Sequence, residues 1–242
     1  MATGLLEGII ANMPMFKQVA RQHLAELARH ARVQHLRRGA AICRRGEWLN
    51  GFFGVAYGQV KLALRADGGE EKVLRLVGPG ETFGEALVFR ERPNPVDAVA
   101  LTDTMLVVFP APAILALLDR DPNFSRGLLA SLSERMHNLV AEIEASTLFS
   151  ARQRIAGYLE SLAAEGGASR VRLPVTKTVI ASRLGVTKET FSRLLRELAN
   201  QGLITVDKRD IVLRDRPRLA EIARPAPARA LSDKRASESA SA

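Results

Sequence analysis

The stretch GVTKETFSRLLREL, residues 185–198, predicts the second helix of a helix-turn-helix together with the turn before it. Gly185 supplies the positive φ that a tight turn between two helices needs, and Thr187 is a good N-cap. Four apolar side chains then recur with the i, i+3, i+4, i+7 spacing of one buried helix face, namely Phe191, Leu194, Leu195 and Leu198. The first helix is expected over Thr176–Leu184, where the small Ala181 lets the two helices approach closely.

The opposite face of this second helix carries polar side chains near its N-terminus, the end at which a recognition helix meets base edges in the major groove. Arg193 can donate two hydrogen bonds to guanine, Glu189 can accept from a cytosine amino group, and Ser192 can reach a base or a phosphate. Lys188 suits a phosphate contact. The alternative for Glu189 and Arg193, at i and i+4, is an ordinary surface ion pair.

A hairpin follows the second helix and extends the motif to a winged helix. Leu203–Val206 and Ile211–Leu213 are short apolar strands separated by the turn Asp207–Arg209. Lys208 and Arg209 at the tip are placed to touch the DNA backbone, or else are simply solvated. The expected DNA-contacting residues are Thr187, Lys188, Glu189, Ser192, Arg193, Lys208 and Arg209.

Composition agrees with a nucleic-acid partner in a reducing compartment. The 242 residues carry a formal net charge of +9, which favours polyanions such as double-stranded DNA. The single cysteine, Cys43, provides neither a disulfide framework nor an iron–sulfur cluster. No segment has the length of a membrane span or the pattern of a signal peptide, so we expect a cytoplasmic protein without membrane contact.

The N-terminal half has a different organisation. A short amphipathic helix is expected over Phe16–Ala31. Between Val33 and Phe109, short apolar runs are punctuated by glycines, with a hairpin turn at Ala66–Gly69. These features predict an antiparallel β-roll, and with the helices an α+β fold.

A long helix is expected to join the two halves. It starts at Asp121-Pro122-Asn123 and carries an apolar stripe at alternating steps of three and four residues, Leu129, Leu132, Met136, Leu139 and Ile143. The stripe predicts a two-stranded homodimer contact, and the alternative is packing against the chain's own roll. We therefore expect a sensor domain over 1–120, a dimerisation helix over 121–149, a winged helix-turn-helix over 150–219 and a disordered tail over 220–242.

This order of elements resembles the family of the cyclic-AMP receptor protein and the fumarate and nitrate reductase regulator. The resemblance covers about Phe16–Leu219, and its most specific parts are Phe83-Gly-Glu-Ala86 and Gly185–Arg193. It implies a small-molecule effector in the roll, RNA polymerase as a partner and, from the E-x-x-S-R arrangement ending at Arg193, a palindrome such as TTGAT-N4-ATCAA. The effector pocket it implies consists of Phe83, Gly84, Glu85, Ala86, Pro95 and Val96.

Departures from the family pattern reduce the number of candidate effectors. Cyclic-AMP binders carry an Arg and a Ser where this chain has Pro95 and Val96, so a cyclic phosphate lacks its bidentate partner and cyclic AMP is not expected. The segments Glu85–Phe89 and Pro93–Val96, together with Glu189–Arg193, look most similar to the Dnr-type regulators of denitrification, and this resemblance implies haem and a response to nitric oxide. The candidate axial ligands are His23, His30, His35, His137 and Cys43, and none is preferred.

Other classes of function stay open at this point. One alternative is a regulator controlled by another small ligand, such as a cyclic dinucleotide. Another is a cyclic-nucleotide-binding subunit without DNA contact, but the predicted winged helix makes this second alternative less favoured. A cupin-like enzyme needs a His/Glu metal site within the strands, yet no histidine lies between His35 and His137. The sequence therefore favours a regulator over an enzyme, and leaves activation or repression undecided.

Overall fold

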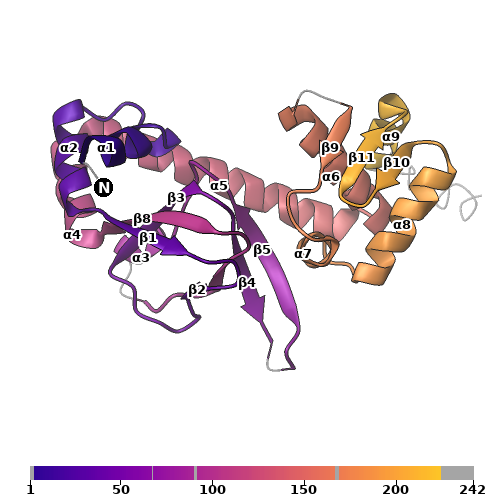
Figure 1. Ribbon diagram of the computed structural model, residues 1–242, viewed down its shortest axis with the longest axis horizontal. Helices are drawn as coiled ribbons and strands as arrows, with labels where there is room; N and C mark the ends of the chain where they lie inside the picture. The colour runs from indigo at the N-terminus through magenta and orange to yellow at the C-terminus, as the bar shows by residue number, and fades with distance from the viewer. Residues whose placement is uncertain (1–2, 67, 90–91, 167–168, 225–242) are drawn as a thin grey trace, which may run out of the picture. The chain divides into compact units, whose positions relative to one another are not determined.

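The computed structural model describes residues 3–66, 68–89, 92–166 and 169–224, so Asp67 of the expected hairpin turn lies outside the described residues. The chain divides into two compact units within one helix, the first ending at Val140 and the second beginning at Ala141 (Figure 1). None of the described helices has both the length and the apolar content required to cross a membrane.

The first unit begins with helical segments, α1 (Thr3–Ala11), the 3-10 turn η1 (Pro14–Phe16) and α2 (Arg21–His30). The single helix expected over Phe16–Ala31 is wrong in its first part, because the chain is extended at Ala20 and only then enters α2. The Ala20 N–H is donated to the carboxylate of Asp121, 3.0 Å away. Phe16 and Val19 are buried as expected, but from a turn rather than from a helix face.

Two antiparallel sheets form the roll, as the glycine-punctuated strands predict. The first sheet has the order β1 (Arg32–Leu36), β8 (Thr104–Pro110), β3 (Gly51–Tyr57), β6 (Thr82–Phe83). The second has the order β2 (Ala41–Cys43), β7 (Asp97–Ala100), β4 (Val60–Arg65), β5 (Glu71–Val77). The short helix α3 (Ala86–Phe89) follows β6, and α4 (Ala111–Arg120) follows β8.

Two apolar cores hold this unit together. One cluster takes side chains from both sheets, among them Phe53, Val60, Phe83 and Leu106, and therefore fills the inside of the roll. The other joins the N-terminal helices to α4, to the start of α5 (Pro122–Leu148) and to the strands β3 and β8. Gly127 allows the closest approach in this second core, since a Cβ there would lie 2.5 Å from the carbonyl oxygen of Met15.

Helix α5 is the long helix expected from the sequence, 27 residues in length. Asp121 caps it, because one carboxylate oxygen accepts the Asn123 N–H at 2.9 Å. Four members of the apolar stripe are 53–66% exposed, Leu129, Met136, Leu139 and Ile143, while Leu132 packs against the second core. Most of the stripe is therefore not used by the chain's own roll.

The second unit contains the end of α5, α6 (Ala151–Gly166), α7 (Lys177–Arg183), α8 (Lys188–Asn200) and α9 (Arg216–Ala223). Its sheet has the order β10 (Ile204–Asp207), β11 (Asp210–Leu213), β9 (Arg170–Arg172). Helix α9 covers the first four residues of the expected tail, 220–223, because Asp215 caps it and Leu219 is fully buried. The rest of the expected tail, 225–242, lies outside the described residues.

Candidate nucleic-acid interface and effector site

The α7–α8 turn has the geometry of a helix-turn-helix. Gly185 has φ +66°, and the Thr187 hydroxyl accepts a hydrogen bond from the Thr190 N–H at 3.1 Å, capping α8. The apolar face of α8 is buried as the spacing predicts, at Phe191, Leu194, Leu195 and Leu198. The buried face fixes which side of α8 remains available to a partner.

That remaining side carries the expected polar residues. Lys188, Glu189 and Arg193 are exposed, and Ser192 is half-buried. Arg193 donates to Glu197 at 2.5 Å, one turn further along α8, rather than to Glu189. Because Arg193 is 63% exposed, this surface pair costs little to break, and its guanidinium is free to turn toward a base edge.

The wing is a tight hairpin in which Asp207 pairs with Asp210, leaving Lys208 and Arg209 as the two turn residues. Lys208 is exposed, with φ +52°. The Arg209 guanidinium instead donates twice to the carbonyl oxygen of Leu173, at 3.0 and 2.7 Å. Both turn residues are therefore exposed cations of the wing, and Arg209 also ties the wing to Leu173, just after β9.

Arg154 of α6 is a site residue that sequence reasoning missed. Its guanidinium donates to the Leu184 carbonyl at 2.9 Å and to the Gly185 carbonyl at 3.5 Å, both in the α7–α8 turn. It also donates to the carbonyl of Phe149, just after α5, at 2.6 Å. One side chain thus links the end of the long helix to the turn that positions the recognition helix.

In the first unit, Glu85 is the one charged residue of the expected effector pocket, and it is only 1% exposed. Arg135 of α5 donates to both of its oxygens, at 2.7 and 3.0 Å, and also to the Thr82 carbonyl at 2.9 Å. The Thr82 hydroxyl completes the set at 2.5 Å from Glu85. This arrangement neutralises a buried carboxylate and joins the pocket segment directly to the long helix.

The other expected pocket residues have varied surroundings. Phe83 is buried in the core of the roll and Gly84 has φ +88°, whereas Ala86 and Pro95 are exposed and Val96 is half-buried. The buried amide of Asn94 holds the Pro95–Val96 segment by donating to the carbonyl of Val96 at 2.5 Å.

Cys43 is buried beneath that same segment, where Asn94 donates to its sulfur at 3.2 Å. Burial raises the pKa of the Cys43 thiol to about 11, and the nearby carboxylate of Glu47 adds to the rise. The thiol therefore stays protonated at neutral pH, which makes it a poor ligand for iron.

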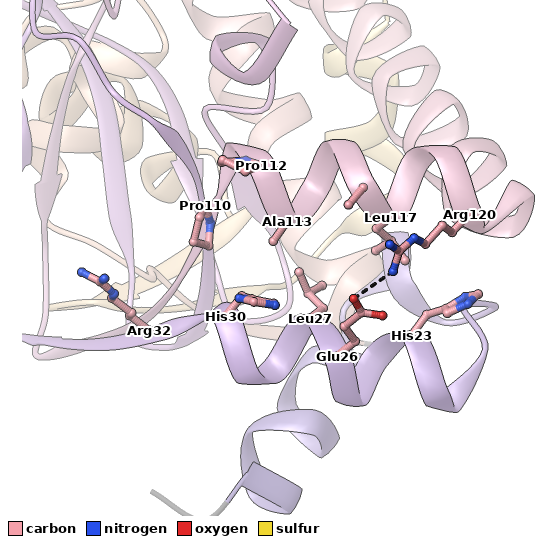
Figure 2. A pocket seen from close by; sticks show the side chains of 11 residues that line it. His23, Glu26, Leu27, His30, Arg32, Pro110, Pro112, Ala113, Leu117 and Arg120 are labelled. Atoms are coloured by element: carbon pink, nitrogen blue, oxygen red, sulfur yellow. Dashed lines mark hydrogen bonds and ion pairs between the residues drawn. The ribbon is translucent and has the colours of Figure 1, made fainter.

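The four histidines lie in different settings. His35 and His137 are exposed, on β1 and α5, while His23 and His30 both line one groove between α2 and α4 (Figure 2). His23 Nδ1 lies 2.9 Å from the buried carboxylate of Asp121. Burial acts to raise the pKa of Asp121, but hydrogen bonds from His23 and from the backbone outweigh it and hold that pKa below its usual value.

Within the described part of the chain, no three His, Cys, Asp or Glu side chains come together in a way that would hold a metal ion.

Comparison with known proteins agrees with this geometry. Residues 33–121 match the cyclic nucleotide-binding domain family, and residues 153–222 match the Crp-like helix-turn-helix domain family. The cyclic AMP receptor protein of Thermus thermophilus is 32% identical over 185 residues, which cover 76% of this chain and 85% of that protein. The CRP-like cAMP-activated global transcriptional regulator of Mycobacterium tuberculosis is 28% identical over 224 residues, 90% of this chain and 100% of that protein.

The fold has solved counterparts as well. The structure of FixK2 from Bradyrhizobium japonicum superposes with a TM-score of 0.73 at 24% identity, covering 81% of this chain and 99% of that one. At this identity the match shows a shared fold and says nothing of a shared ligand.

Proposed function

The chain belongs to the family of the cyclic-AMP receptor protein and the fumarate and nitrate reductase regulator, and on that premise we propose that it is a homodimeric, effector-gated transcription regulator in the cytoplasm. Double-stranded DNA is its direct partner and RNA polymerase its downstream one. The family consists of transcription regulators, and we assign no enzymatic activity to this member.

The observation that carries the DNA assignment is the exposed face of α8. Arg193, Glu189 and Lys188 are exposed on a helix whose opposite face is buried, and the capped N-terminus of α8 brings them to the end that enters a major groove. Guanine suits Arg193 and cytosine suits Glu189. We therefore propose a palindrome such as TTGAT-N4-ATCAA as the binding site.

The test is the binding of the full chain to a labelled TTGAT-N4-ATCAA duplex, measured at two salt concentrations because phosphate contacts make affinity salt-dependent. A control duplex with both guanines changed to adenine should bind more weakly by about 1–3 kcal/mol per half-site. Equal affinity for the two duplexes would reject the assigned half-site.

Two recognition helices must be held about 34 Å apart to read successive major grooves, and the exposed stripe of α5 provides the contact for such a dimer. Its apolar side chains, Leu129, Met136, Leu139 and Ile143, project from a long helix with the spacing of a two-stranded coiled coil.

For the effector we propose haem as the cofactor and nitric oxide as the signal. Of the five candidate ligands, Cys43 is buried and protonated, whereas His23 and His30 share a groove with apolar walls. The Asp121 carboxylate beside His23 Nδ1 is the kind of partner that orients a metal-binding imidazole, and the other ring nitrogen, Nε2, lies 3.5 Å from the side-chain amide nitrogen of the neighbouring Gln22. Haem bound through such a histidine would supply an iron centre to which nitric oxide can bind.

Cyclic AMP is the main competing effector, since two relatives carry it in their names. Against it stand Pro95 and Val96 at the positions expected to hold the cyclic phosphate. A cyclic dinucleotide remains a further alternative, whereas a cyclic-nucleotide-binding subunit without DNA contact is disfavoured by the second unit. An absorption spectrum after haem reconstitution and nitric oxide addition, with a parallel titration of cyclic AMP, separates these candidates, because a Soret band that shifts belongs to haem alone.

A further inference from the structure

The groove between α2 and α4 has a volume of about 400 Å³ and is partly open to solvent, and Figure 2 shows the side chains that line it. Its walls are apolar where the two helices face each other, at Leu27 of α2 and at Ala113 and Leu117 of α4. An apolar molecule that entered it would be removed from water along both helices.

The polar side chains of the groove make it cationic. Arg32 and Arg120 contribute two positive charges, and Glu26 is the one acidic side chain among the residues that line it. Glu26 already pairs with Arg120 across the groove, with 3.0 Å between nitrogen and oxygen. Arg32, toward the other end in Figure 2, makes no ion pair within the part of the chain that the structure describes.

Two imidazoles also line the groove, His30 between the two arginines and His23 at the end beyond Arg120. His30 is exposed and lines the groove, and His23 is oriented by the hydrogen bond between its Nδ1 and Asp121. Hydrogen-bonding groups beside apolar walls favour a ligand with a large apolar body and a charged end. The excess of positive over negative side chains in the groove favours a carboxylate at that end.

We propose that this groove is the effector site and that it binds an apolar molecule carrying a carboxylate, seated on Leu27 and Ala113 with its carboxylate at Arg32. The site rests on the proposed function, because a regulator needs a place where its signal enters. Haem, with its propionates, is one source of this chemistry, and a long-chain fatty acid is another.

The position of the groove suits a signal. Helix α4 ends at Arg120, and the next residue, Asp121, caps α5. The Asp121 carboxylate also forms a hydrogen bond with Nδ1 of His23, which lines the groove. An occupant that moves His23 or competes for Arg120 therefore acts on the first turn of the helix that carries the apolar stripe. The residues at Glu85 and Val96 are not needed for this route.

The test is a titration of the full chain with three probes: haem, iron-free protoporphyrin and oleate. Ala113→Trp fills the groove, and Leu115→Trp is the matched control because Leu115 lies on α4 but does not line the groove. Binding of protoporphyrin or oleate to the wild type, weakened at least about tenfold in Ala113→Trp and unchanged in Leu115→Trp, is the expected result. Arg32→Gln, at an exposed position, should weaken every carboxylate probe several-fold and provides a second variant if Ala113→Trp does not fold.

The outcomes separate the groove from the haem assignment. Binding of oleate and protoporphyrin without a nitric oxide response of the haem complex keeps the groove and removes the proposed signal. Haem uptake that is equal in wild type, Ala113→Trp and Arg32→Gln keeps haem and overturns the groove. No binding of any of the three probes to the wild type overturns both.

Discussion

Arg135 Nη1 lies 2.7 Å from Glu85 Oε2 and connects the long helix α5 to the segment that follows β6. Since Glu85 is nearly inaccessible, its charge depends on this one guanidinium and on the Thr82 hydroxyl. The ion pair therefore couples the segment after β6 to α5 through electrostatics.

Replacing Arg135 with Met should destabilise the first unit by roughly 3–5 kcal/mol, because an unpaired carboxylate would be left buried. The double change Glu85→Gln with Arg135→Met should recover part of this loss, since no charge then remains in the interior. Urea unfolding of both variants measures the difference. Equal stability of the single and the double variant would show that the buried charge is not what matters.

Arg154→Lys should destabilise the second unit by about 1–3 kcal/mol, because an ammonium cannot donate to the Phe149, Leu184 and Gly185 carbonyls together. The charge is retained, so any loss of DNA affinity reflects the position of α8 and not electrostatics. Amide exchange in the α7–α8 turn should be faster than in wild type. The matched control is Arg218→Lys on α9, whose side chain is exposed and which should leave exchange in the turn as it is.

Leu139→Glu should convert the dimer into a monomer, since a charge within the apolar stripe cannot be buried against a second helix without a large free-energy cost. Light scattering should give a mass near the 26.4 kDa of one chain where wild type gives twice that value. Asn138→Glu introduces the same charge at the neighbouring exposed position and should remain dimeric. A dimer that survives Leu139→Glu would place the contact elsewhere.

Cys43 predicts an alkaline loss of stability. Its pKa of about 11 in the folded chain exceeds the value of 9.0 for a free thiol, so the folded state holds the proton more tightly. This contribution is fully present below pH 9 and disappears as the pH rises from 9 toward 11. The free energy of unfolding of the wild type should therefore decrease from pH 9 to pH 11. In Cys43→Ala it should decrease less over the same range. Rapid alkylation of the native thiol at pH 8 would contradict the buried, protonated state.

The helix-turn-helix was predictable because its determinants are local. A positive φ at Gly185, a cap at Thr187 and one apolar face over Phe191–Leu198 each follow from a few neighbouring residues. The roll and the long helix were likewise evident from glycine spacing and from the stripe on α5.

Contacts between distant segments were not predictable. Glu85 and Arg135 are 50 residues apart, and in the sequence Arg135 resembles any polar residue beside an apolar stripe. Arg154 binds backbone carbonyls, and every residue type has one, so the sequence does not show which residues accept these hydrogen bonds. The late start of α2 at Arg21 has the same origin, because it depends on the distant carboxylate of Asp121.

The central claim is that α8 reads DNA through Arg193, and the most direct measurement is the affinity of Arg193→Ala for the TTGAT-N4-ATCAA duplex and for the duplex in which its guanines are replaced. We predict a loss of about 1–3 kcal/mol per half-site on the first duplex, with much smaller discrimination between the two. Arg196→Ala, a change of equal charge at another exposed position of α8, should keep the discrimination. Unchanged affinity and unchanged base preference in Arg193→Ala would contradict the account.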